Sequence, residues 1–457
     1  MKKINSILLL LIMSLSLLSF NCTNSKSKAI NIDPKSTLKQ YVGEYMYEEA
    51  GVIIKIYTKE KESNTKLYLF VTGDRESELI ATEEHKFSFK MEEEFKVEFK
   101  NLKNGIFSEL ILIQPHGTVK AVRNGKAKTD DLATIDKKLI DREFSGVILV
   151  AQNDSIIFNK AYGRKNNQEN GLNDIHTVFD ICSITKQFTS AGILKLLMQN
   201  KLSVTDNLSK YFDAVPDDKK NITIHQLLTH SSGLVDGIGD DYETITEEEF
   251  LSQVFRSKLI HSVGEEFNYS NIGYSLLALI IEKASGMDYE TFLNVEIFKP
   301  SKMNHTGYVI PDWKKNEVAN GFLNGREAKK PNEENWSKNG PYLNLKGNGG
   351  ILTRAGDLLL WSQAIRDNTV LDKETTSKYL YPHFESNNIY SYYGYGWGIE
   401  NNNSENKLVL HGGASDLFAS DLWMYPKKGI TIIVLSNTQE AYVYSIAGKI
   451  SNFLLQQ

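Results

Sequence analysis

The stretch that decides the fold is 178-VFDICSITKQFTSAGILKLLMQN-200. In it, Ser183 stands three residues before Lys186, at the start of a long and mostly apolar segment. Residues at i and i+3 share one face of a helix, so the hydroxyl and the amine are expected to lie side by side. Amide groups at a helix N-terminus also favour developing negative charge. The stretch therefore predicts a nucleophile with a basic partner, and the simpler alternative is an N-cap serine followed by a solvated lysine.

The spacing alone does not decide between these two interpretations. The same Ser-x-x-Lys pattern begins at Ser25, Ser36, Ser63 and Ser404, but only Ser183 opens a strongly apolar helical segment. A lysine in the first turn of a helix opposes the helix dipole, which argues against the N-cap alternative. No Gly-x-Ser-x-Gly motif occurs in the chain, so an α/β-hydrolase arrangement is not supported.

A second candidate element is 265-EEFNYSNIGYSLL-277, in which Tyr269 and Asn271 precede another apolar segment. A Ser–Lys pair needs either a neutral lysine or a second group that relays the proton. A phenol beside a cationic lysine can lose its proton well below its free pKa of about 10. The side chain of Asn271 could orient a substrate amide. The alternative is a surface turn.

A third element is 407-KLVLHGGASDLFASDLWMY-425, where a strand ends in His411, Gly412 and Gly413. Glycines at the end of a strand permit close approach of the backbone to a ligand. The amide of Ala414 could then be an oxyanion donor beside the amide of Ser183, and His411 could bond the substrate. The alternative for His411 is a strand-end histidine in a tight turn.

The order of the expected elements indicates how this part of the chain folds. Two β-rich runs around Asn153 and Asp154 predict a hairpin over 145–163. Helical periodicity dominates from 183 to about 300. Strands return at 407–411, 418–425 and 430–437, and an amphipathic helix over 441–456 follows. We therefore expect an α/β domain in which both ends of the segment build one sheet and a helical lobe is inserted.

In this order and with these flanks, the three elements resemble the serine β-lactamase and penicillin-binding protein superfamily, in its class C-like branch. The resemblance covers roughly residues 130–457 and implies a β-lactamase/DD-peptidase fold. Further stretches carry it: 225-HQLLTHSSGL-234, 284-ASGMDYETFL-293, 347-GNGGILTRAGDLLLWSQAI-365 and 393-YGYGWGI-399. Within the first of these, we expect His230 to be a structural histidine that bonds loop backbone.

The resemblance implies a role for each candidate residue. Ser183 would be acylated, and Lys186 and Tyr269 would share the general base and acid work. Asn271 would hold the substrate amide, and the amides of Ser183 and Ala414 beside Gly413 would form the oxyanion hole.

His411 is a departure from the pattern, because it stands where β-lactamases and many DD-peptidases carry the lysine of a Lys-Thr-Gly triplet. Histidine is mostly neutral near pH 7, so a fixed cation for a substrate carboxylate is missing. A serine hydrolase cleaving esters, amides or peptides is therefore expected first. A DD-peptidase acting on peptidoglycan-derived peptides comes second and a β-lactamase third. The rival from another class is a catalytically silent cell-wall-binding protein.

Composition bounds the remaining classes. The 457 residues are 41% hydrophobic and 24% charged, as in a globular protein of two or three domains. A net charge of −5 at pH 7 offers no basic field, so no nucleic acid is expected as a partner. Cys182 and Cys22 are the two cysteines, which provides no disulfide framework. No metal and no cofactor are expected.

The first part of the chain has a different pattern. Short β-rich segments between residues 29 and 125 predict a small all-β barrel or sandwich. Its opening 40-QYVGEYMY-47 and its close over 111–125 resemble a lipocalin-like accessory domain. The polar segment 126–131 is a plausible linker to the domain over 130–457.

The N-terminal segment 1-MKKINSILLLLIMSLSLLSFNC-22 predicts an export signal, because two lysines precede a short apolar run. Cys22 follows this run at once and resembles the lipidated cysteine of a bacterial lipoprotein. We therefore expect a periplasmic or cell-surface protein that is anchored to the membrane through Cys22, and the alternative is a secreted soluble protein.

Overall fold

The computed structural model describes residues 38–457, apart from gaps at 49–51, 62–63, 72–76, 91–93, 115–116, 124–129, 315, 334–339, 387–389, 402–403 and 440–442. The chain forms two compact units, and the larger one comprises Leu132–Ser386 and Tyr390–Ala447. Segment 1–22 with Cys22 lies outside the described residues, as does most of the expected linker. The export signal, the lipidation and the domain limits 29–125 and 130–457 therefore stay predictions.

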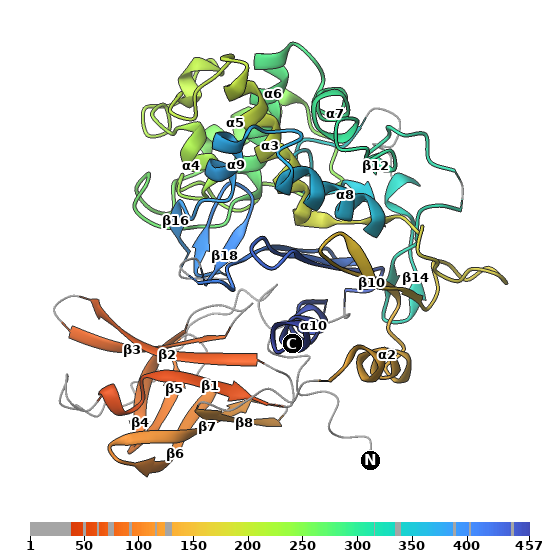
Figure 1. Ribbon diagram of the computed structural model, residues 1–457. Coiled ribbons are helices and arrows are strands. Elements are labelled where there is room, and N and C mark those ends of the chain that lie inside the picture. Colours follow the sequence, from red (N-terminus) through yellow and green to blue (C-terminus); the bar gives the residue numbers. More distant parts are fainter. Residues whose placement is uncertain are drawn as a thin grey trace. The chain divides into compact units, whose positions relative to one another are not determined.

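The smaller unit is a closed antiparallel barrel, drawn in red to orange in Figure 1. Each strand pairs with the next along the chain, and the barrel closes where β1 pairs with β8, with Tyr45 opposite Arg123. Its strands are β1 (Gly43–Tyr47), β2 (Val52–Lys61), β3 (Asn64–Val71), β4 (Ser77–Glu83), β5 (Lys86–Phe89), β6 (Lys96–Lys103), β7 (Ile106–Gln114) and β8 (Gly117–Arg123). Of the two predicted forms, barrel and sandwich, the barrel is confirmed.

Arg123 ties the end of the barrel to its beginning. Its guanidinium donates to the carbonyl oxygens of Phe107 (2.6 Å) and Val42 (2.7 Å) and to the hydroxyl of Tyr45 (2.7 Å). Longer bonds reach the carbonyls of Tyr41 and Gln40, beside the short 3₁₀ helix η1 (Leu38–Gln40). The same guanidinium lies 4.7 Å from the centre of the Tyr45 ring. Five carbonyl and hydroxyl oxygens thus accept from one cation, which fixes the barrel closure.

The larger unit is built on a sheet to which both of its ends contribute. The strand order is β10-β9-β21-β20-β19-β18-β17-β16, and β9 pairs antiparallel with β21. The strands are β9 (Gly146–Gln152), β10 (Ser155–Tyr162), β16 (Phe384–Glu385), β17 (Tyr392–Tyr393), β18 (Gly398–Glu400), β19 (Leu408–Ala414), β20 (Ala419–Tyr425) and β21 (Ile430–Ser436). The predicted hairpin is present, and Asn153 and Asp154 in its turn both have positive φ, as a two-residue type I′ turn requires.

Between these strands the chain forms a helical lobe around α3 (Thr185–Met198), as the periodicity predicted (Figure 1). Every residue of α3 from Thr185 to Leu194 is buried, as expected for a helix without a polar face. The other helices of the lobe are α4 (Ile224–Leu228), α5 (Glu247–Arg256), α6 (Asn271–Ser285), α7 (Tyr289–Leu293), α8 (Ala355–Arg366) and α9 (Lys373–Tyr379), while α2 (Leu132–Asp141) precedes β9 and α10 (Val443–Leu455) follows β21. Across the described residues, none of the helices combines the length and apolar composition needed to cross a membrane.

Short elements complete the unit. β11 (Phe179–Asp180), β15 (Leu352–Thr353) and β12 (Thr306–Gly307) form a small sheet in that order, and β13 (Phe322–Leu323) pairs with β14 (Arg326–Glu327). Short helical turns are η2 (Cys182–Ile184), η3 (Leu208–Lys210), η4 (Asn294–Phe298) and η5 (Pro331–Glu333). The pairing of β11 with β15 matters most here, because β11 leads directly into the turn that carries Ser183.

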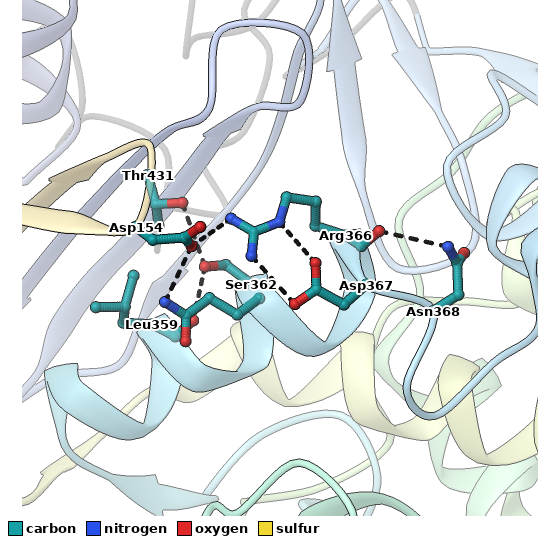
Figure 2. A network of polar contacts seen from close by, with 8 residues as sticks. Asp154, Leu359, Ser362, Arg366, Asp367, Asn368 and Thr431 are labelled. Carbon is teal, nitrogen blue, oxygen red and sulfur yellow. Dashed lines mark hydrogen bonds and ion pairs between the residues drawn. The ribbon is translucent and has the colours of Figure 1, made fainter.

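A polar network fastens α8 to the hairpin of β9 and β10 (Figure 2). Arg366 and Gln363 on α8 both donate to the carboxylate of Asp154 in the hairpin turn, and Arg366 also binds Asp367 in a bidentate pair. Thr431 on β21 donates to Ser362 of the same helix at 3.2 Å. The first hairpin and a late strand are thus both attached to α8.

Candidate active site

Ser183 lies in a tight turn between β11 and α3. The carboxylate of Asp180 accepts the N–H of Cys182 at 2.7 Å, and Cys182 takes a left-handed backbone with φ of 47°. Over residues 177–194, Ser183 is the one residue that is not buried. The turn therefore leaves the hydroxyl of Ser183 partly exposed while its neighbours in the chain are buried.

Lys186 is completely buried, and its amine has three neighbours that are all uncharged. Its Nζ lies 2.7 Å from Asn271 Oδ1, 2.8 Å from the carbonyl oxygen of Asn348 and 3.1 Å from Ser183 Oγ. Burial lowers the pKa of Lys186 to about 7, although the more distant charges of Asp236 and Asp241 oppose this shift. A neutral amine has two N–H groups and one lone pair. Two oxygens that can only accept occupy the N–H groups, so the lone pair remains for the proton of Ser183.

Tyr269 contacts the same two groups. Its ring centre lies 4.7 Å from Lys186 Nζ, and its hydroxyl shares a hydrogen bond with Ser183. Burial raises the pKa of Tyr269 well above its usual value, and the bond with Ser183 opposes this only in part. The expectation that the nearby lysine would lower this pKa is therefore wrong for the free protein. Desolvation of the phenolate, together with the nearby groups Tyr390, Asp236 and Tyr274, outweighs the hydrogen bond, so Tyr269 holds its proton.

Asn271 begins α6, whose N-cap is Ser270. Its amide nitrogen donates to Asp236 Oδ1 at 2.9 Å, while its oxygen faces Lys186. Asp236 also accepts from the backbone N–H of Asn271. The carboxylate thus fixes which end of the carboxamide points at the lysine. In the free protein both ends of this side chain already have partners.

The end of β19 lies directly against the Ser183 turn. A Cβ on Gly413 would stand 2.4 Å from the carbonyl oxygen of Ile181 and 2.8 Å from the amide nitrogen of Ser183, so only glycine fits there. Ala414, the next residue, is exposed at the end of the strand. This contact brings the backbone of Gly413 and Ala414 to the Ser183 turn.

His411 is buried on the same strand, and both ring nitrogens have protein partners. Nδ1 donates to the carbonyl oxygen of Gly412 at 2.6 Å, so Nε2 accepts from the hydroxyl of Tyr393 at 2.9 Å. Burial and the charge of Lys186 lower the pKa of His411 to about 3, although the bond to Gly412 raises it slightly. His411 is therefore neutral at ordinary pH and supplies no cation to the site.

The structure thus gathers Ser183, Lys186, Tyr269 and Asn271 within direct contact and places Gly413 against them. Sequence reasoning assigned no role to Asp236, Asn348 or Tyr393. Asn348 and Tyr393 lie in stretches that carried the family resemblance, whereas Asp236 had no signal beyond its place after 225-HQLLTHSSGL-234. In the part of the chain that the structure describes, no group of three or more His, Cys, Asp or Glu side chains is arranged to hold a metal ion.

Comparison with known proteins places this site in a family. Residues 132–453 match the family model described as Beta-lactamase. The chain is 27% identical over 336 residues to Penicillin-binding protein 4* of Bacillus subtilis (strain 168), a match that covers 70% of this chain and 74% of that protein. It is 31% identical over 313 residues to Protein flp of Staphylococcus aureus (strain COL), covering 65% of this chain but only 60% of that protein.

A solved structure agrees with these matches. The penicillin-binding protein from Bacillus halodurans superposes with a TM-score of 0.61 at 27% identity, over 69% of this chain and 99% of that one. The predicted β-lactamase/DD-peptidase fold of the larger unit is confirmed, and it follows an eight-stranded barrel.

Proposed function

The chain belongs to the beta-lactamase family, and we propose that it is a class C-like serine hydrolase that cleaves an ester, amide or peptide bond through an acyl-enzyme on Ser183. The observation that carries this proposal is the surrounding of Lys186. Two carbonyl oxygens hold its N–H groups, and Ser183 Oγ lies 3.1 Å away on the remaining side. A lysine with a pKa of about 7 is half neutral at neutral pH, which suits a general base.

The proposed reaction uses each group once per step. Lys186 takes the proton of Ser183 as Oγ attacks the substrate carbonyl, and the amides of Ser183 and Ala414 bind the oxyanion. Tyr269, which keeps its proton, delivers it to the leaving group and is reprotonated through Lys186. Water then attacks the acyl-enzyme. In this step Tyr269 and Lys186 pass protons in the opposite direction, from the water to Ser183 Oγ. Asn271 positions Lys186 in this scheme as well as any substrate amide.

The state of His411 supports esters, amides and peptides ahead of β-lactams. Its ring is neutral and both nitrogens are occupied, so a substrate carboxylate finds no cation on this strand. A DD-peptidase is the second candidate, because relatives are named penicillin-binding proteins. A β-lactamase is third. A silent cell-wall-binding protein is the rival of another class, and the intact set of Ser183, Lys186 and Tyr269 argues against it.

Intact-mass measurement tests the proposal. Protein lacking residues 1–22 is exposed separately to a fluorophosphonate and to a penicillin, with Ser183→Ala as the control. We expect a Ser183-dependent phosphonate adduct. A lasting penicillin adduct as well would favour cell-wall peptides, whereas no adduct in folded protein would favour the binding protein.

We also propose that the protein is exported and anchored to the membrane through lipidated Cys22. An alkyne-labelled fatty acid fed to expressing bacteria should label the wild type but not Cys22→Ala. Protein that is released into the medium and carries no fatty-acid label would instead favour secretion.

The eight-stranded barrel is proposed to be a lipocalin-like accessory domain that acts as a spacer or docking module. Its filled aromatic interior, with Tyr41, Phe99 and Phe107 among the buried residues, supports a structural role. Residues 130–457 expressed alone should then react with the fluorophosphonate at the rate of the longer protein. A rate more than tenfold lower would show that the barrel contributes to catalysis.

A further inference from the structure

His230 contacts the segment around Tyr269 at three points. Its carbonyl oxygen accepts the N–H of Asn268 at 2.7 Å, and its Nδ1 accepts the N–H of Ser270 at 3.0 Å. Its ring stacks on the ring of Tyr269, with centroids 4.2 Å apart and planes 29° apart. The residues on both sides of Tyr269 and the Tyr269 ring itself are therefore held by one side chain and its backbone.

The conformation and burial of His230 are energetically unfavourable, and a purely structural role would not require them. His230 is buried, and its φ of 55° lies in the left-handed region. Because Nδ1 accepts a hydrogen bond, Nε2 carries the proton, and that buried N–H has no hydrogen-bond partner among the residues that the structure describes. An asparagine would tolerate this backbone and could still accept the N–H of Ser270. What asparagine would lose is the ring, which also lies near Tyr393 (4.7 Å) and Tyr274 (5.0 Å) but is closest to Tyr269 (4.2 Å) and is stacked on it.

The orientation of the Tyr269 ring matters for the chemistry. Its hydroxyl must stay on Ser183 while Lys186 Nζ lies 4.7 Å from the ring centre. A rotated ring would break the first contact, and small displacements of this kind cost catalysis heavily. Burial, together with Lys186 and His411, keeps the pKa of His230 well below its usual value, so Nδ1 remains an acceptor.

We propose that His230 is a positioning residue that holds the hydroxyl of Tyr269 against Ser183. The inference rests on the proposed function, in which Tyr269 moves a proton to and from the Ser183 site. It goes beyond the structural role that the sequence suggested for His230, because it requires the effect of His230 to pass through Tyr269.

A double-mutant cycle tests this. The kcat for hydrolysis of a p-nitrophenyl ester is measured in the wild type, His230→Asn, Tyr269→Phe and the double variant, after thermal unfolding has shown that each is folded. We expect His230→Asn to lower kcat about 10- to 100-fold in the wild type, and less than threefold when Tyr269 is already phenylalanine. His230→Phe restores an aromatic ring without the bond to Ser270, and it should turn the ester over faster than His230→Asn.

Equal slowing by His230→Asn in both backgrounds would overturn the inference, because the loss would then not pass through Tyr269. If His230→Asn does not fold, the same cycle is run with His230→Gly, which suits the left-handed backbone and also lacks the ring, and equal slowing in both backgrounds has the same meaning. A wild type that shows no Ser183-dependent labelling at all would instead remove the proposed function, a result distinct from an additive cycle.

Discussion

Each unit of this protein holds a cation among uncharged oxygens, and the two cations behave in opposite ways. In the barrel, Arg123 donates to carbonyls and to the hydroxyl of Tyr45. In the larger unit, Lys186 is surrounded by Asn271, Asn348 and Ser183. A guanidinium keeps its proton in proteins and has no lone pair to offer, whereas a buried amine can release one. Similar surroundings thus suit a fixed structural cation in one unit and, in the proposed reaction, a base in the other.

The largest expected effect comes from exchanging one cation type for the other at the catalytic position. Lys186→Arg keeps a positive charge but cannot provide a lone pair, so fluorophosphonate labelling of Ser183 should fall at least about 10³-fold. Lys201→Arg, at an exposed position, is the matched control and should label normally. If Lys186→Arg kept more than a tenth of the wild-type rate, a permanent positive charge would be enough to activate Ser183. The contrast drawn between Lys186 and Arg123 would then be wrong.

Tyr269→Phe should lower the turnover of a p-nitrophenyl ester by about 10²-fold, since it removes the proton donor but leaves the ring packing. The effect should fall on kcat more than on KM, because the lost contact acts in the transition state. Steady-state kinetics measure this directly. An unchanged kcat would assign the whole proton transfer to Lys186.

The reverse exchange in the barrel should affect stability and not chemistry. Arg123→Lys loses most of the bonds to the carbonyls of Phe107 and Val42, at a cost of about 1–3 kcal/mol in the free energy of unfolding of the barrel. Denaturant unfolding measures this, with the exposed Lys103→Arg as control. Labelling of Ser183 should not change, and a slowed reaction would contradict a purely structural Arg123.

The smallest effect is expected at Tyr393→Phe, which removes the hydroxyl that donates to Nε2 of His411. His411 stays neutral because it remains buried, so ester turnover should fall only about two- to fivefold. A gain of penicillin hydrolysis in this variant would contradict the assignment of His411 as a neutral residue.

Features of the fold and of the candidate site could be predicted from the sequence where they depend on residues close together in the chain. The Ser183–Lys186 pair, the hairpin at Asn153–Asp154 and the sheet built from both ends followed from local patterns. The choice of barrel over sandwich did not, because closure depends on long-range pairing of β1 with β8. The proton on Tyr269 was also mispredicted, since burial is a property of the folded core and not of neighbours in sequence. Asp236 was missed for the same reason, because its contact with Asn271 spans 35 residues.

The most direct test of the central claim is the pH dependence of the rate at which an uncharged fluorophosphonate labels Ser183. A base must be unprotonated to act, so the rate should rise with pH, fall about tenfold per unit below the midpoint, and have its midpoint near pH 7. Burial raises the pKa of Asp180 to about 7 as well, so Asp180→Asn is the control and should keep the midpoint. A rate that is flat between pH 5 and 9, or a midpoint that disappears in Asp180→Asn, would contradict Lys186 as the neutral base.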